Sequence, residues 1–294
     1  MRLIKAMVSL NESDFNRLRN SMRYFWLVVL IVFSSLTSLR AETARMTVLM
    51  NAMEMDGLLD TMHLEHIALA DELEAELFPG RGGAEWNKEL SALYDPKGMR
   101  ATLSTEFDGQ INEPLYDAAL AFFQSDLGQK IVLAENSTRE AMLEPEMDAA
   151  ANDNMMTVAE EDPARFALIE EMVEKGDLIE NNVTSGLNAN FSFYKGIIDG
   201  KGFPYEVSED EALAETWAGA DGMRAETKVW LYSYFTLAYS TLSQDELREY
   251  IDFTTSPSGK RLNRVFFDSF DKLFVDLSYA TGRAVARRMA GNEI

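Results

Sequence analysis

The stretch FTTSPSGKR at Phe253–Arg261 admits two interpretations, a phosphate-binding loop or a corner between two helices. The phosphate-binding motif requires a glycine five residues before its Gly-Lys pair and a serine or threonine directly after it. Thr254 and Arg261 stand at those two positions, and no strand pattern precedes the stretch. We therefore interpret FTTSPSGKR as a corner between helices.

A second copy of this corner, FFQSDLGQK, lies at Phe122–Lys130. In each copy a serine precedes a glycine by three residues, and its hydroxyl can accept a hydrogen bond from the free amides of the next helix. A proline at the first helical position loses nothing by lacking an N–H. A glycine in the first turn permits close approach of a neighbouring backbone. We predict a structural motif formed by Ser125, Gly128, Ser256, Pro257, Gly259 and Lys260.

The two corners belong to a longer self-similarity. At a shift of 120 residues the loop PGRGG (Pro79–Gly83) aligns with DGKGF (Asp199–Phe203). From Trp86 onward the shift is 131, which implies an eleven-residue insertion within Gly202–Ala214. The aligned pairs include Arg45 with Arg165, Trp86 with Trp217, Ile111 with Leu242, and Phe122 with Phe253. This single register predicts an internal duplication; the alternative is a chance alignment of two similarly patterned helical segments.

The periodicity of the chain predicts helices almost throughout. Apolar residues recur at spacings of three and four, and no stretch alternates at a spacing of two. Ser208–Glu211 and Ser243–Glu246 fit the capping box that starts a helix. Pro145 lies inside a helical pattern and is expected to kink a long helix. We predict an all-α protein with two related multi-helix units in tandem, at residues 42–160 and 161–294.

The N-terminal region has the order of a secretory signal peptide. An unbroken apolar run, YFWLVVLIVF (Tyr24–Phe33), follows three arginines and precedes a small, polar stretch that ends at Ala41. The run is shorter than the ~20 residues that a membrane-spanning helix needs. We expect a cleaved signal at Met1–Ala41, with Met22 as a possible true start, and a periplasmic protein. The alternative is an uncleaved segment that anchors the protein in the inner membrane.

Composition narrows the range of partners. The 294 residues include 27 basic and 49 acidic ones, a net charge of −22, so this acidic protein is not expected to bind nucleic acid or anionic membranes. A membrane contact is expected only through the N-terminal segment, if it stays uncleaved. The chain has no cysteine, which excludes disulfides, thiol catalysis and thiolate metal sites.

The two histidines of the chain, His63 and His66, lie in MHLEHIALADELE with Glu65 between them. Imidazoles three residues apart share a helix face and could bind zinc or copper. The spacing differs from the i,i+4 pair of a zinc-protease helix, and no third ligand is evident. No Gly-x-Ser-x-Gly motif occurs either. We expect ordinary surface or half-buried histidines, no cofactor and no catalytic residues.

The segments LSQDELREYIDFTTSPSGKRL (Leu242–Leu262) and LAFFQSDLGQKIVLAENSTREAML (Leu120–Leu143) resemble a bacterial family known as domain of unknown function 2059. The likeness is expected to be closest over Leu237–Met289, with a degenerate copy at Ile111–Met147. The phrases ELFPGRGG and LNANFSFYKG resemble a longer, duplicated form in exported alphaproteobacterial proteins. The chain departs from the family phrase at Asp126, where proline is usual, and at Arg261, where lysine is usual. The resemblance implies a periplasmic helical protein and lends no activity.

These observations favour a non-enzymatic binding or interaction module whose partner is a periplasmic protein or a small ligand. One alternative is a metal-dependent hydrolase that uses His63, His66 and Glu65. Another is a structural protein of the cell envelope.

Overall fold

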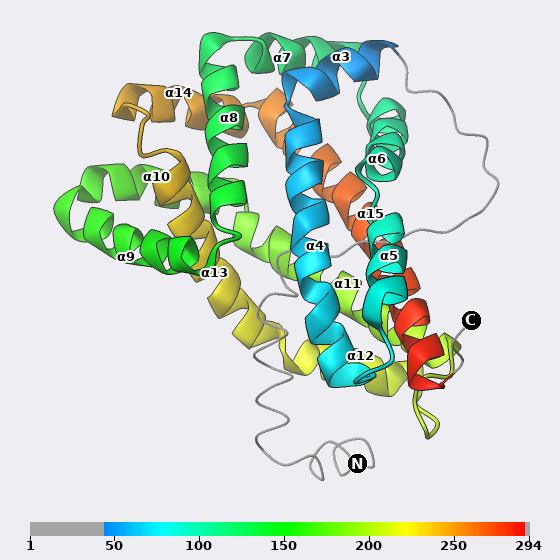
Figure 1. Ribbon diagram of the computed structural model, residues 1–294. Coiled ribbons are helices and arrows are strands. Elements are labelled where there is room, and N and C mark those ends of the chain that lie inside the picture. Colours follow the sequence, from blue (N-terminus) through cyan, green and yellow to red (C-terminus); the bar gives the residue numbers. More distant parts are fainter. Residues whose placement is uncertain (1–43, 292–294) are drawn as a thin grey trace.

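The computed structural model describes residues 44–291, and within this range all regular secondary structure is helical (Figure 1). The predicted all-α class is thereby confirmed. The predicted signal segment, Met1–Ala41, lies outside the described residues. In the described part of the chain, no helix is both long and apolar enough to cross a membrane.

The helices follow one another with short connections. Those before residue 162 are α3 (Ala44–Ala52), α4 (Met55–Leu77), α5 (Gly83–Leu93), α6 (Pro96–Gln110), α7 (Glu113–Phe123), α8 (Asp126–Ala141) and α9 (Pro145–Glu161). Those after it are α10 (Pro163–Lys175), α11 (Leu178–Asp199), α12 (Glu209–Ala218), α13 (Ala220–Ala238), α14 (Gln244–Thr255) and α15 (Pro257–Met289). Both predicted capping boxes are present, at the starts of α12 and α14.

The expectation that Pro145 kinks a long helix is wrong. Helix α8 ends at Ala141, and Pro145 is the first residue of a separate helix, α9. The preceding residue, Glu144, is extended, with φ −82° and ψ 123°. Steric contact with a proline ring disfavours the helical conformation for the residue before it, so the chain turns instead of bending.

The described residues form three hydrophobic clusters, and the two larger ones each contain helices from both halves of the chain. The larger core combines residues of α3–α7 with residues of α11 and α15, among them Leu59, Trp86 and Val285. The smaller core combines α10, α13 and α14 with Ile131 of α8. In Figure 1, α15 passes behind α4 towards the C-terminus near α5. The units predicted at 42–160 and 161–294 therefore share their interiors.

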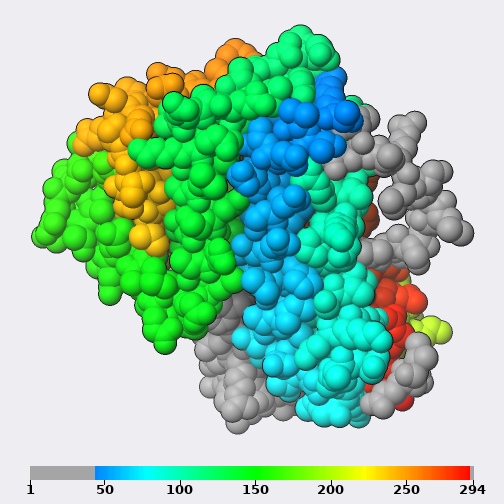
Figure 2. Space-filling view, turned by 45° about the horizontal axis from the view of Figure 1, so that its top comes forward, coloured from blue at the N-terminus to red at the C-terminus, as the bar shows by residue number. Residues whose placement is uncertain are grey.

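Helices that the predicted duplication pairs, α3–α8 with α10–α15, make several similar contacts. Helix α4 contacts α5, α6 and α8, as Figure 2 shows on one face of the molecule, and α11 contacts α12, α13 and α15. Helix α3 packs on α7, and α10 packs on α14. A guanidinium N–H of Arg45 donates to the carbonyl of Ile111 at 2.6 Å, and one of Arg165 donates to that of Leu242 at 2.8 Å.

Helices α8 and α15 each also contact helices of the other half. Helix α8 packs on α13 and α14, and α15 packs on α6 and α7. At the start of α8, Lys130 Nζ lies 2.8 Å from Glu246 Oε1 of α14. This lysine and the capping hydrogen bonds of Ser243 lower the pKa of Glu246 to about 2. These contacts of α8 and α15 join the halves.

Helices α11 and α15 make the most extensive helix contact, and two glycines permit it. A Cβ atom built on Gly196 would lie 2.1 Å from the carbonyl oxygen of Tyr279. One built on Gly282 would lie 2.1 Å from the carbonyl oxygen of Phe193. The two backbones approach so closely that no side chain fits between them.

Candidate functional site

The two Ser/Gly corners have the same geometry. The hydroxyl of Ser125 accepts from the N–H of Gly128 at 3.0 Å, and that of Ser256 accepts from Gly259 at 3.0 Å. Each hydroxyl also donates, at 2.7 Å, to the carbonyl three residues before it, on Phe122 or Phe253. These hydrogen bonds join consecutive helices.

The remaining residues of the predicted motif support the corner in different ways. Pro257 is the first residue of α15. Lys260 is exposed, and its backbone N–H donates to the carbonyl of Ser256 at 2.9 Å. A Cβ atom on Gly128 would lie 2.1 Å from the Phe122 carbonyl oxygen, and one on Gly259 would lie 2.0 Å from that of Phe253. The glycines therefore let the preceding backbone pass close to the new helix.

His63 and His66 both contact Tyr94, whereas Glu65 contacts a residue of another helix. His63 Nδ1 lies 2.9 Å from the carbonyl oxygen of Tyr94. His66 is buried, with Nδ1 2.5 Å from the carbonyl oxygen of Met62 and its ring 3.7 Å from that of Tyr94. Between residues 44 and 291, no group of three or more histidine, cysteine, aspartate or glutamate side chains is placed to hold a metal ion.

Glu65 forms an ion pair instead. Two nitrogens of Arg139 each donate to a different oxygen of its carboxylate at 2.9 Å. The pair connects α4 to α8, and both side chains are largely shielded from solvent. A metal-dependent hydrolase would need Glu65 beside both imidazoles, and this geometry does not bring the three together.

A cluster that sequence reasoning missed surrounds Glu135 of α8. Its carboxylate accepts from the hydroxyls of Tyr239 at 2.5 Å and Tyr250 at 3.2 Å. Its backbone carbonyl accepts from the hydroxyl of Tyr234 at 3.0 Å. Burial raises the pKa of Glu135, and the two hydroxyls that hydrogen-bond to the carboxylate partly oppose this. Glu135 lies in α8, and the three tyrosines lie in α13, directly after it, and in α14. Because these elements are far apart in the sequence, no local pattern could have revealed the cluster.

The three hydroxyls join α8 to the second half. Burial, and then the Glu135 charge, raise the pKa of Tyr234, Tyr239 and Tyr250 well above its ordinary value. These groups therefore stay protonated and act as hydrogen-bond donors. The arrangement serves to hold the halves together.

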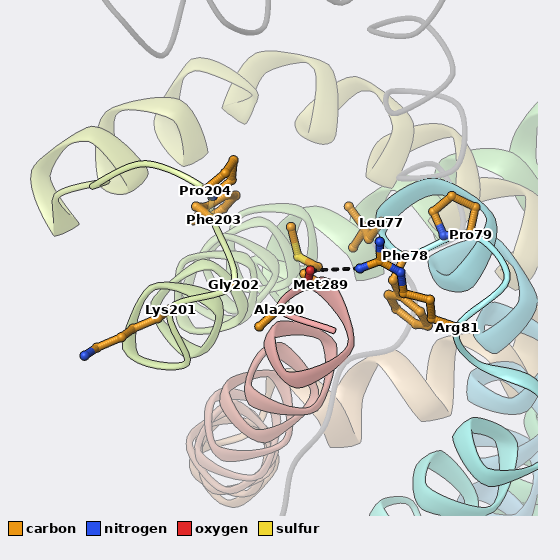
Figure 3. Close-up of a pocket in the computed structure, with 10 residues that line it drawn as sticks. All are labelled: Leu77, Phe78, Pro79, Arg81, Lys201, Gly202, Phe203, Pro204, Met289 and Ala290. Carbon is orange, nitrogen blue, oxygen red and sulfur yellow. Dashed lines mark hydrogen bonds between the residues drawn. The ribbon is translucent and has the colours of Figure 1, made fainter. Parts of the chain in front are cut away.

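A pocket of about 430 Å³ lies where the two aligned loops meet the end of α15 (Figure 3). Its lining is mostly apolar and includes Phe78, Phe203 and Met289. Arg81 faces Met289 in Figure 3, and its Nη1 donates to the carbonyls of Arg288 at 3.2 Å and Met289 at 3.0 Å. The Lys201 side chain points away from the pocket. Arg81 thus satisfies the last carbonyls of α15, and the pocket offers mainly apolar contacts.

Helix α12 exposes large apolar side chains on one face. Trp217 is 61% exposed, and Leu213, one turn earlier, is 41% exposed. The opposite side of the helix buries the small residues Ala212 and Thr216. We name the exposed surface formed by Leu213, Ala214, Trp217 and Ala218 the Trp217 face.

Trp86, the residue aligned with Trp217, has the opposite environment. It is fully buried, and its indole N–H donates to the carbonyl of Ala70 at 2.7 Å. The guanidinium of Arg288, from α15, lies 4.7 Å from its ring centroid. The spacing of Leu213 and Trp217 resembles a buried stripe, so periodicity alone would have assigned both to the core.

Comparison with known proteins gives one finding. Residues 99–157 match the family described as an uncharacterized protein conserved in bacteria (DUF2059), which supports the family assignment that the resemblance predicted. The matched segment includes the first corner and Glu135, whereas the Trp217 face lies outside it. The closer likeness expected over Leu237–Met289 stays a prediction. No curated protein and no solved structure matches the chain.

Proposed function

We propose that this chain, assigned to a bacterial family of uncharacterized proteins, is an exported, non-enzymatic interaction module that binds a partner protein through the Trp217 face. The observation that carries the proposal is the 61% exposure of Trp217 beside an exposed Leu213. Tryptophan is enriched at the energetic centres of protein interfaces, because it buries a large apolar area at little cost in conformational entropy. A contiguous apolar face on a helix is a common docking surface.

Photo-crosslinking in the native cell tests this role. The variant Ala218→benzoylphenylalanine places a reactive ketone beside Trp217, and Ala149→benzoylphenylalanine places it at an exposed position of α9. We expect the first variant to give a discrete crosslinked product that Trp217→Ala removes, and the second to lack that product. Identical products from both positions would contradict the proposal.

Export is the second part of the proposal. It is supported by the apolar run Tyr24–Phe33 with its preceding arginines and by the small residues up to Ala41. Cell fractionation, followed by sequencing of the mature N-terminus, tests it. We expect a periplasmic protein that begins at Glu42, and an intact N-terminus in the cytoplasm would exclude export.

We also infer that the two halves are copies of one ancestral unit. The matching helix contacts support this inference, as do the equivalent hydrogen bonds of Arg45 and Arg165. An experimental structure tests it by superposition of α3–α8 on α10–α15. Helices that fail to match in order and direction would leave chance alignment as the explanation.

A further inference from the structure

We infer that the partner presents a basic amphipathic helix, whose apolar stripe covers the Trp217 face and whose arginine or lysine side chains pair with the acidic residues around it. This inference rests on the proposed function and specifies the chemistry of the partner. Three features of the molecule support it: the shape of the face, its charge, and the packing of α15 over Trp86, the tryptophan that aligns with Trp217.

The shape of the face suits a helix. Leu213 and Trp217 lie one turn apart, with Ala214 and Ala218 beside them, and all four are exposed. Small residues next to large ones form a shallow groove into which the ridge of a second helix can fit. The face extends over about two turns, because α12 runs only from Glu209 to Ala218.

The charge of the face favours a basic partner. Helix α12 carries four acidic residues and no lysine or arginine: Glu209, Asp210, Glu211 and Glu215. Glu209 pairs with Lys195, and Glu211 completes the capping box with Ser208. Within residues 44–291, neither Asp210 nor Glu215 has a cation at ion-pair distance. A partner with positive charge would neutralise both carboxylates, whereas an acidic partner would be repelled.

The chain itself contains a precedent for such a contact. The C-terminal part of α15 is amphipathic and carries Arg287 and Arg288 in its last turn. Arg288 stacks over the Trp86 ring, and its Nη1 lies 2.7 Å from Oε2 of Glu89, one turn beyond the tryptophan. One guanidinium thus contacts both an aromatic face and a carboxylate.

The Trp217 face also has an aromatic ring beside a carboxylate, but no described helix packs over it as α15 packs over Trp86. Asp221 follows Trp217 by four residues, and its side chain is fully exposed apart from an ion pair with Arg224. An arginine of the partner helix could stack on Trp217 and reach Asp221 or Glu215. The internal contact at Trp86 therefore indicates which residues the partner should present.

A binding experiment with the mature chain, residues 42–294, tests the inference. The probe is a fluorescently labelled amphipathic helical peptide with leucine on one face and arginine on its flanks. The matched probe carries glutamate in place of arginine. We expect the basic peptide to bind at least about tenfold more tightly than the acidic one, and Trp217→Ala to weaken its binding about tenfold or more.

Two further variants test the contribution of the acidic residues and the specificity for the Trp217 face. The double variant Asp210→Asn with Glu215→Gln should weaken binding of the basic peptide about threefold to tenfold and reduce its dependence on salt concentration. Leu133→Ala, which removes a 55% exposed side chain of α8, should leave binding within about twofold. Since Trp217 is exposed, its replacement by alanine should leave the melting temperature nearly unchanged, which excludes misfolding as the cause.

The outcomes separate the inference from the proposed function. Equal binding of the basic and acidic peptides would overturn the inferred chemistry, and a crosslink from position 218 in cells would still support an interaction module. Binding of the basic peptide that survives Trp217→Ala would show that it occupies another surface, which also overturns the inference. Failure of both the crosslink and the peptide would remove the function and the inference together.

Discussion

The aromatic rings of Phe122 and Phe253 stack face to face, with centroids 3.7 Å apart and planes inclined by only 3°. These are the residues that the shift of 131 aligns, each three positions before the serine of its corner. Where a two-fold axis relates two copies of a unit, equivalent residues near the axis meet each other. The helix contacts are reciprocal as well: α8 packs on α13 and α14, and α15 packs on α6 and α7. The stack agrees with the duplication proposed above, in which Phe122 and Phe253 would be equivalent residues near an axis between the copies.

Stacking of the two phenylalanines predicts energetic coupling between them. We expect Phe122→Ala and Phe253→Ala each to lower the free energy of unfolding by roughly 1–3 kcal/mol, because both rings are half-buried. The double variant should lose about 1 kcal/mol less than the sum of the single losses. Urea denaturation of the four proteins measures the coupling. Strictly additive losses would mean that the stack contributes nothing beyond burial.

The corner glycines predict a large difference between two Gly→Ala substitutions. Gly259→Ala should lower the free energy of unfolding by roughly 2–4 kcal/mol, because its Cβ would lie 2.0 Å from a carbonyl oxygen. Gly109 lies in α6 with nothing within 4 Å of a built Cβ, so Gly109→Ala should stabilise the protein by about 0.5–1 kcal/mol. Thermal and urea unfolding measure both variants. Similar effects at both positions would contradict the close approach.

Glu135 predicts a specific dependence of stability on pH. Its pKa is raised above the ordinary value of 4.5, so the folded protein holds this proton more tightly than the unfolded chain does. The resulting stabilisation is fully present below pH 4.5 and is lost as the pH rises through the raised pKa. We therefore expect wild type to lose stability relative to Glu135→Gln as the pH rises from acidic to neutral.

Urea unfolding of wild type and Glu135→Gln over that pH range measures the difference. Glu140→Gln replaces an exposed acidic residue of the same helix and serves as the matched control. Its pH profile should run parallel to that of wild type. A parallel profile for Glu135→Gln as well would mean that the tyrosine cluster does not favour the protonated carboxyl.

The equivalent arginines predict equivalent losses. Arg45→Met removes a hydrogen bond to the carbonyl of Ile111, and Arg165→Met removes one to the carbonyl of Leu242. Both side chains also pair with an acidic residue, Glu113 or Asp162. We expect each variant to lose roughly 1–3 kcal/mol of unfolding free energy, since a carbonyl loses a charged donor. Loss in only one half, measured by calorimetry, would show that the two contacts are not equivalent.

Local features of the fold could be predicted from the sequence. The helical class, both capping boxes and the separation of helices at the Ser/Gly corners depend on residues within one or two turns of each other. Pro145 shows the limit even of local reasoning: a proline inside a helical pattern predicts a kink, whereas here it begins a separate helix. Whether a helix resumes after a proline in register depends on tertiary packing.

Features that join distant helices could not be predicted. The hydroxyls around Glu135 come from residues 99 to 115 positions away in the sequence. Burial of Trp86 depends on α15, while the spacing of Leu213 and Trp217 indicates a core stripe that the structure leaves exposed. The predicted boundary between residues 160 and 161 falls close to the gap between α9 and α10. The packing of α8 and α15 against helices of the other half has no local signal in the sequence.

The contribution of α15 to the larger core constrains the order of events during synthesis. Residues of α15 complete the core around Leu59 and Trp86, so that core cannot close until residues 257–289 have been synthesised. Domains whose interiors are complete early can fold while translation continues, and this chain lacks that option. A polypeptide whose larger core waits for α15 stays unfolded for longer during synthesis, which would suit the export proposed above.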